Sequence, residues 1–404
     1  NSTGKVSMDD NGICLNLMNG HASCETMSRN RKRHYSNGSK ERDAKRSRTE
    51  SQDKCMSWED LPEEILSTVF RFLSNSDKSN AALVNKSWKR VFSVPSHWVY
   101  FDINLTTITF EQGLDICKLI SSEIKELTIN SETYRLTSTC QCVSVRVLVN
   151  LFRALIDKEA FDIKQIRLLN MSHILSNVDN ASHDLVALMT ILIKKQKNLR
   201  YFKLDSVSMT TENSCDILDA LTGKISVRSL NLIHIAKRPD EPIMQRLRSL
   251  LRSMNYLENL QVGNVALNDS VLGSLALSVS KLTVHILNAS DPPTLVGWKF
   301  LMKINPELKL KLVLPRQINM DKEDFENFLI DDMAVSSVYL TIDMSSMSFV
   351  HQVIAKRLKN TLKHLNLSIK GNVDVSEVFM AYSGKGDDCQ TRGHMTVSAW
   401  KVRN

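Results

Sequence analysis

The residues that could support acid–base or nucleophilic chemistry do not form a catalytic pattern in this sequence. Asp331 and Asp332 are an adjacent carboxylate pair at an expected helix end or loop, where solvated side chains are commoner than a general acid and base. The chain has no P-loop, no G-x-S-x-G turn and no H-E-x-x-H motif. Six histidines are spread singly along the chain rather than grouped as a relay: His173, His183, His234, His285, His351 and His364. We therefore predict neither enzymatic activity nor a cofactor.

The cysteines indicate neither a metal site nor a disulfide framework. They are scattered over nearly the whole length, at Cys14, Cys24, Cys55, Cys117, Cys140, Cys142, Cys215 and Cys389. Only Cys140 and Cys142 are close together, and no second pair or nearby histidine completes a zinc site. We expect ordinary thiols in a loop there, no metal, and a reducing compartment.

No stretch of this sequence is long and apolar enough to suggest a membrane span. The longest apolar runs, such as 186–193, fall well short of the roughly 20 residues that span a bilayer. We therefore expect a soluble, intracellular protein with no membrane partner.

Residues 1–56 are basic and are predicted to be disordered. They carry 11 Lys/Arg against 7 Asp/Glu, which is a net +4 of the chain's +8, and they lack any apolar period. Two basic clusters separated by eleven residues are typical of a bipartite nuclear-import signal: Arg31, Lys32 and Arg33, then Lys45, Arg46 and Arg48. The alternatives are a solvated charge run or nonspecific contact with nucleic acid. We expect the protein in the nucleus and the cytoplasm.

The sequence becomes apolar with a helical period from Ser57 onward. One stripe recurs every four residues, at Leu61, Ile65, Val69 and Leu73, with Leu66 and Phe70 beside it. We expect Asp60 to cap this helix and Pro62 to occupy its first turn. A second helical stretch carries Ala81, Leu83, Val84, Trp88 and Val91, and Trp98 closes the segment. Three short helices bury little surface alone, which favours a partner, although the stripe could also pack on the same chain.

These residues resemble the F-box family. The match runs from Leu61-Pro62 and the acidic pair Glu63-Glu64 through Phe72-Leu73 and Ala82–Trp88 to Trp98, with Asn85 where the family usually has Cys. The resemblance implies that Skp1, the linker to cullin and the RING subunit, binds Leu61, Pro62, Ile65, Leu66, Val69, Phe70, Leu73 and Val84. It also implies that Trp88 and Trp98 form the F-box core.

An apolar-x-x-apolar-x-apolar unit then repeats through the rest of the chain. It begins at Ile124, Ile163, Leu199, Val227, Leu257, Val279, Val335 and Leu362, and a further unit lies near Leu310 and Leu312. Amphipathic stretches lie between these units, at 184–196, 215–221, 243–254, 271–279 and 349–358. Steps of about 28 residues are typical of helix-containing leucine-rich repeats, which stack into a solenoid. The alternative is another α/β domain with frequent short strands.

The predicted organisation is α/β: a disordered tail at 1–56, an F-box at 57–102, a leucine-rich-repeat domain at 103–380 and an irregular segment at 381–404. The order of F-box and repeats resembles the leucine-rich F-box-only proteins, especially the subgroup numbered thirty-three and thirty-nine. That resemblance implies a non-catalytic substrate adaptor of a Skp1–cullin–F-box ubiquitin ligase. Two alternatives remain: a Skp1-bound scaffold that delivers no substrate, and a nuclear nucleic-acid binder, for which no specific readout module is visible.

The substrate surface is expected on the exposed face of the repeat strands. Basic residues recur between the apolar positions, at Lys164, Arg167, Arg200, Lys203 and Arg228. Parallel strands bring equivalent positions about 4.8 Å apart, so Lys164, Arg200 and Arg228 are predicted to form one ladder. Such a ladder favours an acidic or phosphorylated protein segment. The alternative is that these charges only keep exposed strands soluble.

The import hypothesis predicts that replacing both basic clusters by alanine lowers nuclear accumulation. The replacement removes the charges that two linked binding events need. Imaging a fluorescent fusion of the chain measures the effect. Unchanged nuclear accumulation would contradict the hypothesis, and replacing Arg29 and Lys40 instead is the control.

Overall fold

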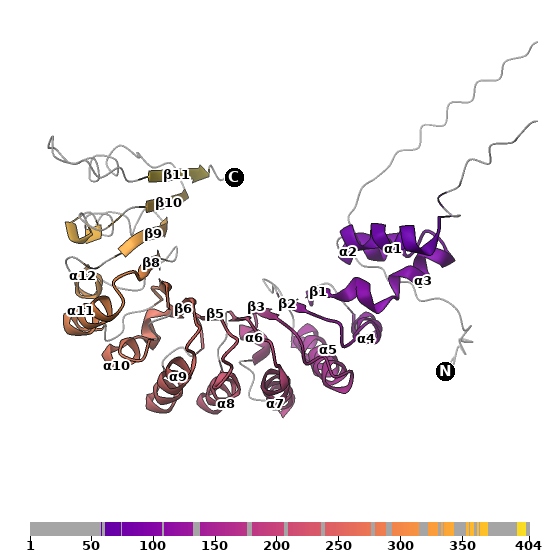
Figure 1. The fold of residues 1–404 in the computed structure, drawn as a ribbon, viewed down its shortest axis with the longest axis horizontal. Helices are drawn as coiled ribbons and strands as arrows, with labels where there is room; N and C mark the ends of the chain where they lie inside the picture. The colour runs from indigo at the N-terminus through magenta and orange to yellow at the C-terminus, as the bar shows by residue number, and fades with distance from the viewer. Residues whose placement is uncertain are drawn as a thin grey trace, which may run out of the picture. The chain divides into compact units, whose positions relative to one another are not determined.

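The structure is a computed structural model. From β1 onward it consists of strand–helix units that follow one another in chain order (Figure 1). It describes residues 58, 61–73, 75–106, 109–131, 138–175, 180–205, 209–235, 239–275, 279–287, 293–314, 322–329, 333, 335–342, 353–354, 356–358, 362, 364–370 and 394–400. The chain divides into two compact units, Asn1–His97 and Trp98–Asn404. Each unit is described by itself.

The first unit is helical in its described part. It comprises α1 Glu63–Phe72, α2 Asn75–Ala81, α3 Lys86–Phe92 and a 3-10 turn at Pro95–Trp98. Pro62 precedes α1 as its N-cap and makes no side-chain capping bond. The helix therefore begins at Glu63, two residues later than an N-cap at Asp60 predicts. The predicted cap, Asp60, lies outside the described residues. Asn85 caps α3 by accepting a hydrogen bond from the Trp88 backbone N–H at 2.9 Å.

The second unit is built on a parallel sheet whose strands follow chain order, eleven of them in the described residues. The strands are β1 Tyr100–Asn104, β2 Glu126–Asn130, β3 Gln165–Leu169, β4 Tyr201–Leu204, β5 Ser229–Leu232, β6 Asn259–Gly263, β7 Lys281–His285, β8 Lys309–Leu314, β9 Val335–Ile342, β10 His364–Lys370 and β11 His394–Trp400. Each strand pairs only with its neighbours in sequence, as in a solenoid.

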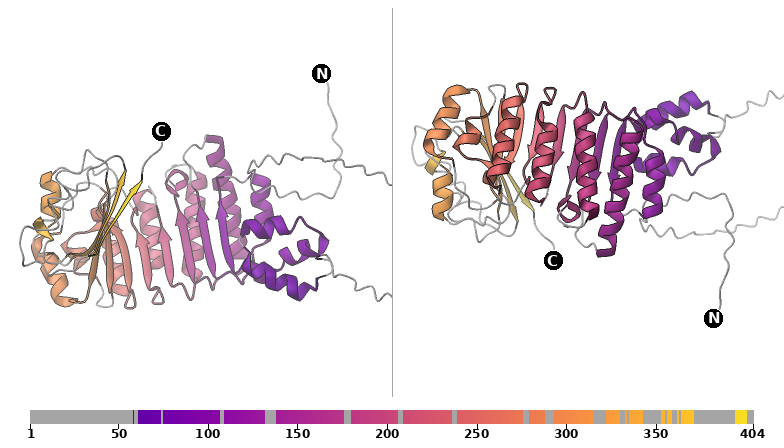
Figure 2. Two further views of the ribbon diagram at one scale, coloured as in Figure 1. Left: turned by 90° about the horizontal axis from the view of Figure 1, so that it is seen from above. Right: turned by 90° about the horizontal axis from the view of Figure 1, so that it is seen from below.

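Helices cover one face of this sheet and leave the other face open (Figure 2). They are α4 Phe110–Lys118, α5 Ser138–Asp157, α6 Ser172–Leu175, α7 Asn180–Lys195, α8 Thr211–Leu221, α9 Glu241–Ser253, α10 Asp269–Leu272, α11 Leu295–Ile304 and α12 Lys322–Phe328. The strands line the inner side of the curve and the helices the outer side (Figure 1). The predicted leucine-rich-repeat solenoid is confirmed.

The apolar positions of the repeat form continuous buried columns. Ile166, Phe202 and Leu230 are register partners on β3, β4 and β5, and all are buried. Side chains alternate along a strand, so these residues face the helices while the residues between them face the open side. Each column is closed by the next repeat, because a single strand and helix leave one apolar edge exposed.

The structure corrects several boundaries expected from the sequence. The repeat sheet begins at Tyr100 rather than after 103, because Phe101 and Ile103 alternate into the core of the second unit. The segment 381–404, expected to be irregular, contains β11, which pairs in parallel with β10. Cys140 and Cys142 lie in α5, not in a loop. Asp331 and Asp332 lie outside the described residues.

The predicted helical stretches at 184–196, 215–221 and 243–254 are confirmed as α7, α8 and α9. The stretch at 271–279 is helical only as far as Leu272, where α10 ends. Half of the stretch at 349–358 lies outside the described residues, and within the other half residues 353–354 and 356–357 are helical.

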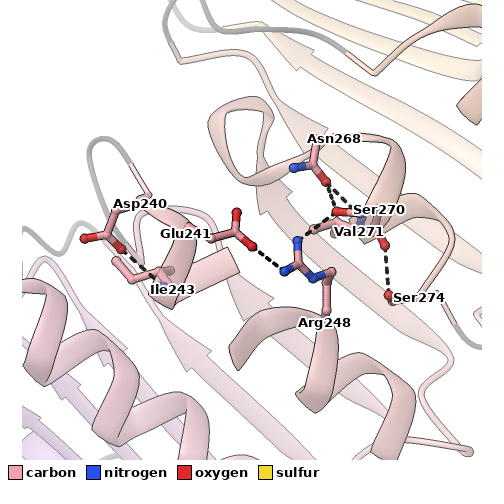
Figure 3. A network of polar contacts seen from close by, with 8 residues as sticks. All are labelled: Asp240, Glu241, Ile243, Arg248, Asn268, Ser270, Val271 and Ser274. Atoms are coloured by element: carbon pink, nitrogen blue, oxygen red, sulfur yellow. Dashed lines mark hydrogen bonds and ion pairs between the residues drawn. The ribbon is translucent and has the colours of Figure 1, made fainter. Parts of the chain in front are cut away.

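Polar contacts at the helix N-termini join neighbouring repeats on the outer side (Figure 3). Arg248 of α9 donates to the Ser270 hydroxyl at 2.9 Å and forms an ion pair with Glu241. Ser270 in turn donates to Asn268, which caps α10. The same pattern links α8 to α9, because the Thr211 hydroxyl donates to the Asp240 cap at 2.6 Å. These bonds fix the stagger between successive helices.

Gly297 is required where α10 meets α11. The Asp269 carboxylate accepts hydrogen bonds from the Thr294 backbone N–H and hydroxyl, both at 2.7 Å. Thr294 caps α11, and a Cβ on Gly297 would overlap the Asp269 carboxylate. A larger residue at this position therefore forces Asp269 out of its two hydrogen bonds.

We expect Gly297→Ala to destabilise the repeat unit by about 1–2 kcal/mol, since it overpacks the contact and breaks those bonds. Gly273→Ala is the matched control, because its Cβ would meet the nearest atom, the Asp269 carbonyl oxygen, at 3.4 Å. Urea unfolding of the full chain measures both variants. In an Asp269→Ala background the cost of Gly297→Ala should largely disappear. Equal costs in both backgrounds would contradict this explanation.

Candidate functional site

The apolar stripe predicted on α1 divides into two faces. Leu66 and Phe70 are fully buried inside the first unit. The Phe70 ring contacts Trp88 edge-on at 6.0 Å between centroids and His97 at 5.8 Å. The prediction that Leu66 and Phe70 contact a partner is therefore corrected, because both side chains form the core of the unit.

The other face of α1 is open to solvent. Ile65 is 51% exposed and Phe72 is 85% exposed, and Val69, which is half-buried, lies between them in sequence. The turn between α2 and α3 adds Leu83 and Val84, which are 59% and 57% exposed. Phe72 and Leu83 were not among the predicted contact residues. The sequence spacing could have identified Phe72, because Ile65, Val69 and Phe72 fall at i, i+4 and i+7 of one helix face. This face is offset by one residue from the face that carries Leu66 and Phe70.

The remaining predicted F-box residues lie at the edges of these two faces. Leu61 and Leu73 are half-buried and Pro62 is exposed. Trp88 is half-buried, packs against Phe70 and donates from its indole N–H to the Trp58 carbonyl at 3.4 Å. Trp98 is buried but falls in the second unit, where its ring lies 6.0 Å from Phe101.

A buried polar cluster supports the first unit. The Lys78 ammonium donates to the His97 carbonyl at 2.7 Å, and the His97 ring lies 3.1 Å from the Ser67 hydroxyl. Burial lowers the pKa of Lys78. Burial, and then the charges of Lys78 and Arg71, lower the pKa of His97. A neutral His97 therefore packs against Phe70 in the core, and the cluster is structural.

The predicted basic ladder exists at the start of the strands. Arg200 donates its backbone N–H to the Lys164 carbonyl at 2.8 Å, and Arg228 donates to Arg200 at 2.9 Å. All three side chains are exposed, one residue before β3, β4 and β5. Arg167 and Lys203 are register partners farther along, on the open face. The five residues therefore form two rows rather than one.

Much of the charge in these rows is compensated. Lys203 forms an ion pair with Asp205 at 3.2 Å, and Arg228 with Glu258 at 2.5 Å. Arg167 donates to Gln165 at 2.7 Å and lies 5.2 Å from the Tyr201 ring centre. Among the predicted residues, Lys164, Arg167 and Arg200 have no ion pair within the described residues.

Just before β2, Lys125 is neutralised in the same way. It donates to Asp162 at 2.5 Å. That hydrogen bond, followed by the one from Asn198, lowers the pKa of Asp162. The basic character of this end of the sheet is therefore smaller than the sequence suggests.

Two histidines that are far apart in sequence, His234 and His285, are close enough for the charge of one to lower the pKa of the other. His285 ends β7, and His234 follows β5, so one strand separates them. That strand contributes Gly263, where a Cβ would lie 2.6 Å from the Ile233 carbonyl oxygen and 2.7 Å from the Leu287 side chain. Burial, and then the charge of His234, lower the pKa of His285 to about 4. The Nε2 atom of His285 is buried without a hydrogen-bond partner in the described part of the chain.

The described residues contain no group of three or more His, Cys, Asp or Glu side chains placed to hold a metal ion. Burial raises the pKa of the Cys117 thiol to about 11, which makes it a poor nucleophile. No helix in the described ranges is long and apolar enough to cross a membrane. The two import clusters, and the side chains of Cys140 and Cys142, lie outside what the structure describes.

Comparison with known proteins identifies a domain that covers the end of the first unit and the beginning of the second. A family model described as F-box-like matches residues 58–104. The chain contains an F-box-like domain. Among solved structures it is similar to the crystal structure of the Rad7 and Elc1 complex in yeast, with 14% identity over 79% of each chain and a TM-score of 0.41. It is also similar to the leucine-rich repeat-containing protein LegL7 from Legionella pneumophila, with 14% identity over 71% of this chain and 99% of that one and a TM-score of 0.36.

We predict that acid lowers the stability of the second unit because of His285 and His234. The pKa of His285 is about 4 in the folded protein and ordinarily near 6.5, so the unfolded chain binds more protons between these values. Stability should therefore fall by about 2 kcal/mol as the pH drops from about 6.5 to about 4.5. Burial also lowers the pKa of His234, which adds a loss of the same sign. Asp162 and Asp240, whose pKa values hydrogen bonds lower, lose their contribution only below this window.

Thermal unfolding of the full chain between pH 7 and pH 4.5 measures this dependence. His285→Gln should flatten the profile, because glutamine takes up no proton. His183→Gln, at an exposed position on α7, is the matched control and should leave the profile unchanged. A His285→Gln profile as steep as that of the parent protein would exclude His285 as the cause.

Proposed function

We propose that this chain is the substrate-recognition adaptor of a Skp1–cullin–F-box ubiquitin ligase. In this proposal the F-box-like domain binds Skp1, which links it to cullin and the RING subunit, and the repeats bind a protein substrate. The observation that carries it is the open apolar face of α1 in a domain that matches the F-box-like model. The order of F-box and repeats also supports the finer resemblance to the F-box-only subgroup numbered thirty-three and thirty-nine.

The exposed apolar residues have the energetics of a docking surface. Burying one large apolar side chain contributes about 1.5–3 kcal/mol, and a few central residues usually dominate an interface. Ile65, Phe72, Leu83 and Val84 are all more than half exposed, on a unit too small to cover them with its own side chains. The docking residues we propose are these four with Leu61, Pro62, Val69 and Leu73, while Leu66 and Phe70 hold α1 in place.

The repeat sheet suits the recognition of a protein. Its open face offers polar columns on strands that are held rigidly in register, which limits the entropy lost on binding. The ubiquitin-transfer chemistry would then belong to the partner subunits. The adaptor would supply proximity and orientation.

The second hypothesis is that the chain is a Skp1-bound scaffold that delivers no substrate, which predicts the same F-box contacts. Depletion of the chain distinguishes the adaptor hypothesis from the scaffold hypothesis. Under the adaptor hypothesis, proteins captured by the repeats accumulate after depletion. They also become more abundant on the adaptor after proteasome inhibition. Unchanged half-lives for every captured protein would favour the scaffold.

The adaptor proposal predicts that Ile65→Ser combined with Phe72→Ser weakens Skp1 binding by at least about 100-fold, because two apolar anchors are lost. Both side chains are exposed, so the helical fold of the unit should remain. The matched control is Ile225→Ser with Tyr256→Ser, which removes exposed apolar side chains from the repeats instead. Titration calorimetry of the full chain with Skp1 measures affinity. Equal affinity of the two double variants would refute the proposed docking face.

A further inference from the structure

Three lysines gather on the open face of β7 and β8. Lys281 and Lys309 are register partners at the starts of the two strands, and both are exposed. Lys311 follows two residues later on β8, on the same face as Lys309. We call Lys281, Lys309 and Lys311 the lysine cluster.

The register neighbours of the lysine cluster are neutral. Asn259 lies beside Lys281, and Thr283 and Ser337 lie on either side of Lys311. The acid nearest in register is Glu258, one residue before β6, and its carboxylate is paired with Arg228. No lysine of the cluster forms an ion pair within the described residues.

The cluster differs in this respect from Lys203 and Arg228 on the same sheet. At β4 and β5 a carboxylate accompanies the basic residue, as in Lys203–Asp205 and Arg228–Glu258. Like charges directly opposite each other on neighbouring strands destabilise a sheet. Burial, and then the charge of Lys281, lower the pKa of Lys311, which reflects the same repulsion. An anion bound at the lysine cluster would therefore offset the repulsion among its three ammonium groups.

The spacing of the cluster suits an extended peptide. Lys309 and Lys311 are two residues apart on one strand, about 6.6 Å, which is also the spacing of alternate side chains in an extended ligand. Lys281 and Lys309 are about 4.8 Å apart across the strands, so one carboxylate can lie between them. Acidic side chains at alternate positions would therefore meet the cluster in sequence.

The chemistry of the cluster favours carboxylates on a peptide over nucleic acid or phosphate. Single-stranded nucleic acid needs aromatic faces on which bases stack. The aromatic ring beside the cluster is Tyr339, and the Lys311 ammonium covers its face at 3.4 Å from the ring centre. The cluster also offers ammonium groups without the planar fork by which arginine holds a phosphate.

We propose that the lysine cluster binds an acidic segment of a partner protein, with glutamate or aspartate side chains at alternate positions of an extended chain. The proposal rests on the proposed function only in taking that partner to be the substrate. It also moves the expected acidic-ligand site from β3–β5 to β7–β8, because Lys203 and Arg228 of the first region are held in ion pairs, whereas no lysine of the cluster is.

The test measures binding of a labelled nine-residue peptide with glutamate at alternate positions to the full chain, by fluorescence anisotropy. Lys281→Glu with Lys309→Glu should weaken binding at least about tenfold, since two attractive charges become repulsive. Lys164→Glu with Arg200→Glu is the matched control, because it changes the net charge equally at exposed residues of the same sheet. The control should stay within about twofold. Raising salt from 0.1 M to 1 M, which shortens the screening length from about 10 Å to about 3 Å, should weaken binding to the parent protein.

Several results would overturn the proposal. They are equal binding of a glutamine version of the peptide, and equal loss in the two double variants. Binding of a phosphoserine peptide but not the glutamate peptide would assign the cluster to phosphate. Tighter binding of oligouridine with the same dependence on Lys281 and Lys309 would assign it to nucleic acid. Skp1 is absent from this assay, so failure here leaves the Skp1 titration as a separate test of the proposed function.

A stability measurement checks the physical premise independently. Lys281→Gln removes a repulsion and should raise the thermal midpoint of the full chain slightly. Lys125→Gln removes the ion pair with Asp162 and should lower it or leave it unchanged. A lower midpoint for Lys281→Gln than for Lys125→Gln would show that the cluster is compensated.

Discussion

The rest of the second unit depends on the exposed apolar edge that each repeat presents to the next. A strand and a helix bury one face of their residues, and only another strand and helix can cover the remaining edge. The buried columns through Ile166, Phe202 and Leu230 result from this requirement, since register must place apolar residues side by side. The bonds from Thr211 to Asp240 and from Thr294 to Asp269 repeat the same coupling at the helix ends.

The same register determines what the open face presents. Once the apolar residues face the helices, alternation leaves the residues between them in straight columns across the sheet. Like charges then lie directly opposite each other wherever two successive repeats carry them. Along β4 and β5 a nearby carboxylate relieves this, whereas Lys281 and Lys309 have no such acid among the described residues. The sheet of the second unit thus carries ion-paired basic residues at Lys203 and Arg228 and a cationic region at Lys281 and Lys309.

The sequence predicts what is local or periodic, and it misses what depends on register or on helix phase. The strand units from Ile124 onward follow from the apolar spacing, and the F-box-like domain follows from Leu61 to Trp98. A stripe of apolar residues at every fourth position does not distinguish two faces of α1 that differ by one residue. The sequence therefore predicts a partner contact for Leu66 and Phe70, whereas the structure buries both in the core. His234 and His285 influence each other because only β6 separates β5 from β7, and their 51-residue separation in sequence gives no sign of it. Strand β11 was missed because its Met395 and Val397 form a shorter apolar pattern than the other repeats.

A solenoid tolerates such a charge cluster more easily than a single-core protein does. Stability in a repeat array is approximately a sum of terms between neighbours, so repulsion between Lys281 and Lys309 weakens one interface and leaves distant ones unchanged. The columns on either side, Leu282 with Leu310 and Val284 with Leu312, are fully buried and offset that local cost. An unfavourable surface feature can therefore persist where it strengthens the binding of a ligand of opposite charge. The F-box-like domain has no such reserve, because its few helices must use Leu66 and Phe70 for their own core and leave Ile65 and Phe72 exposed.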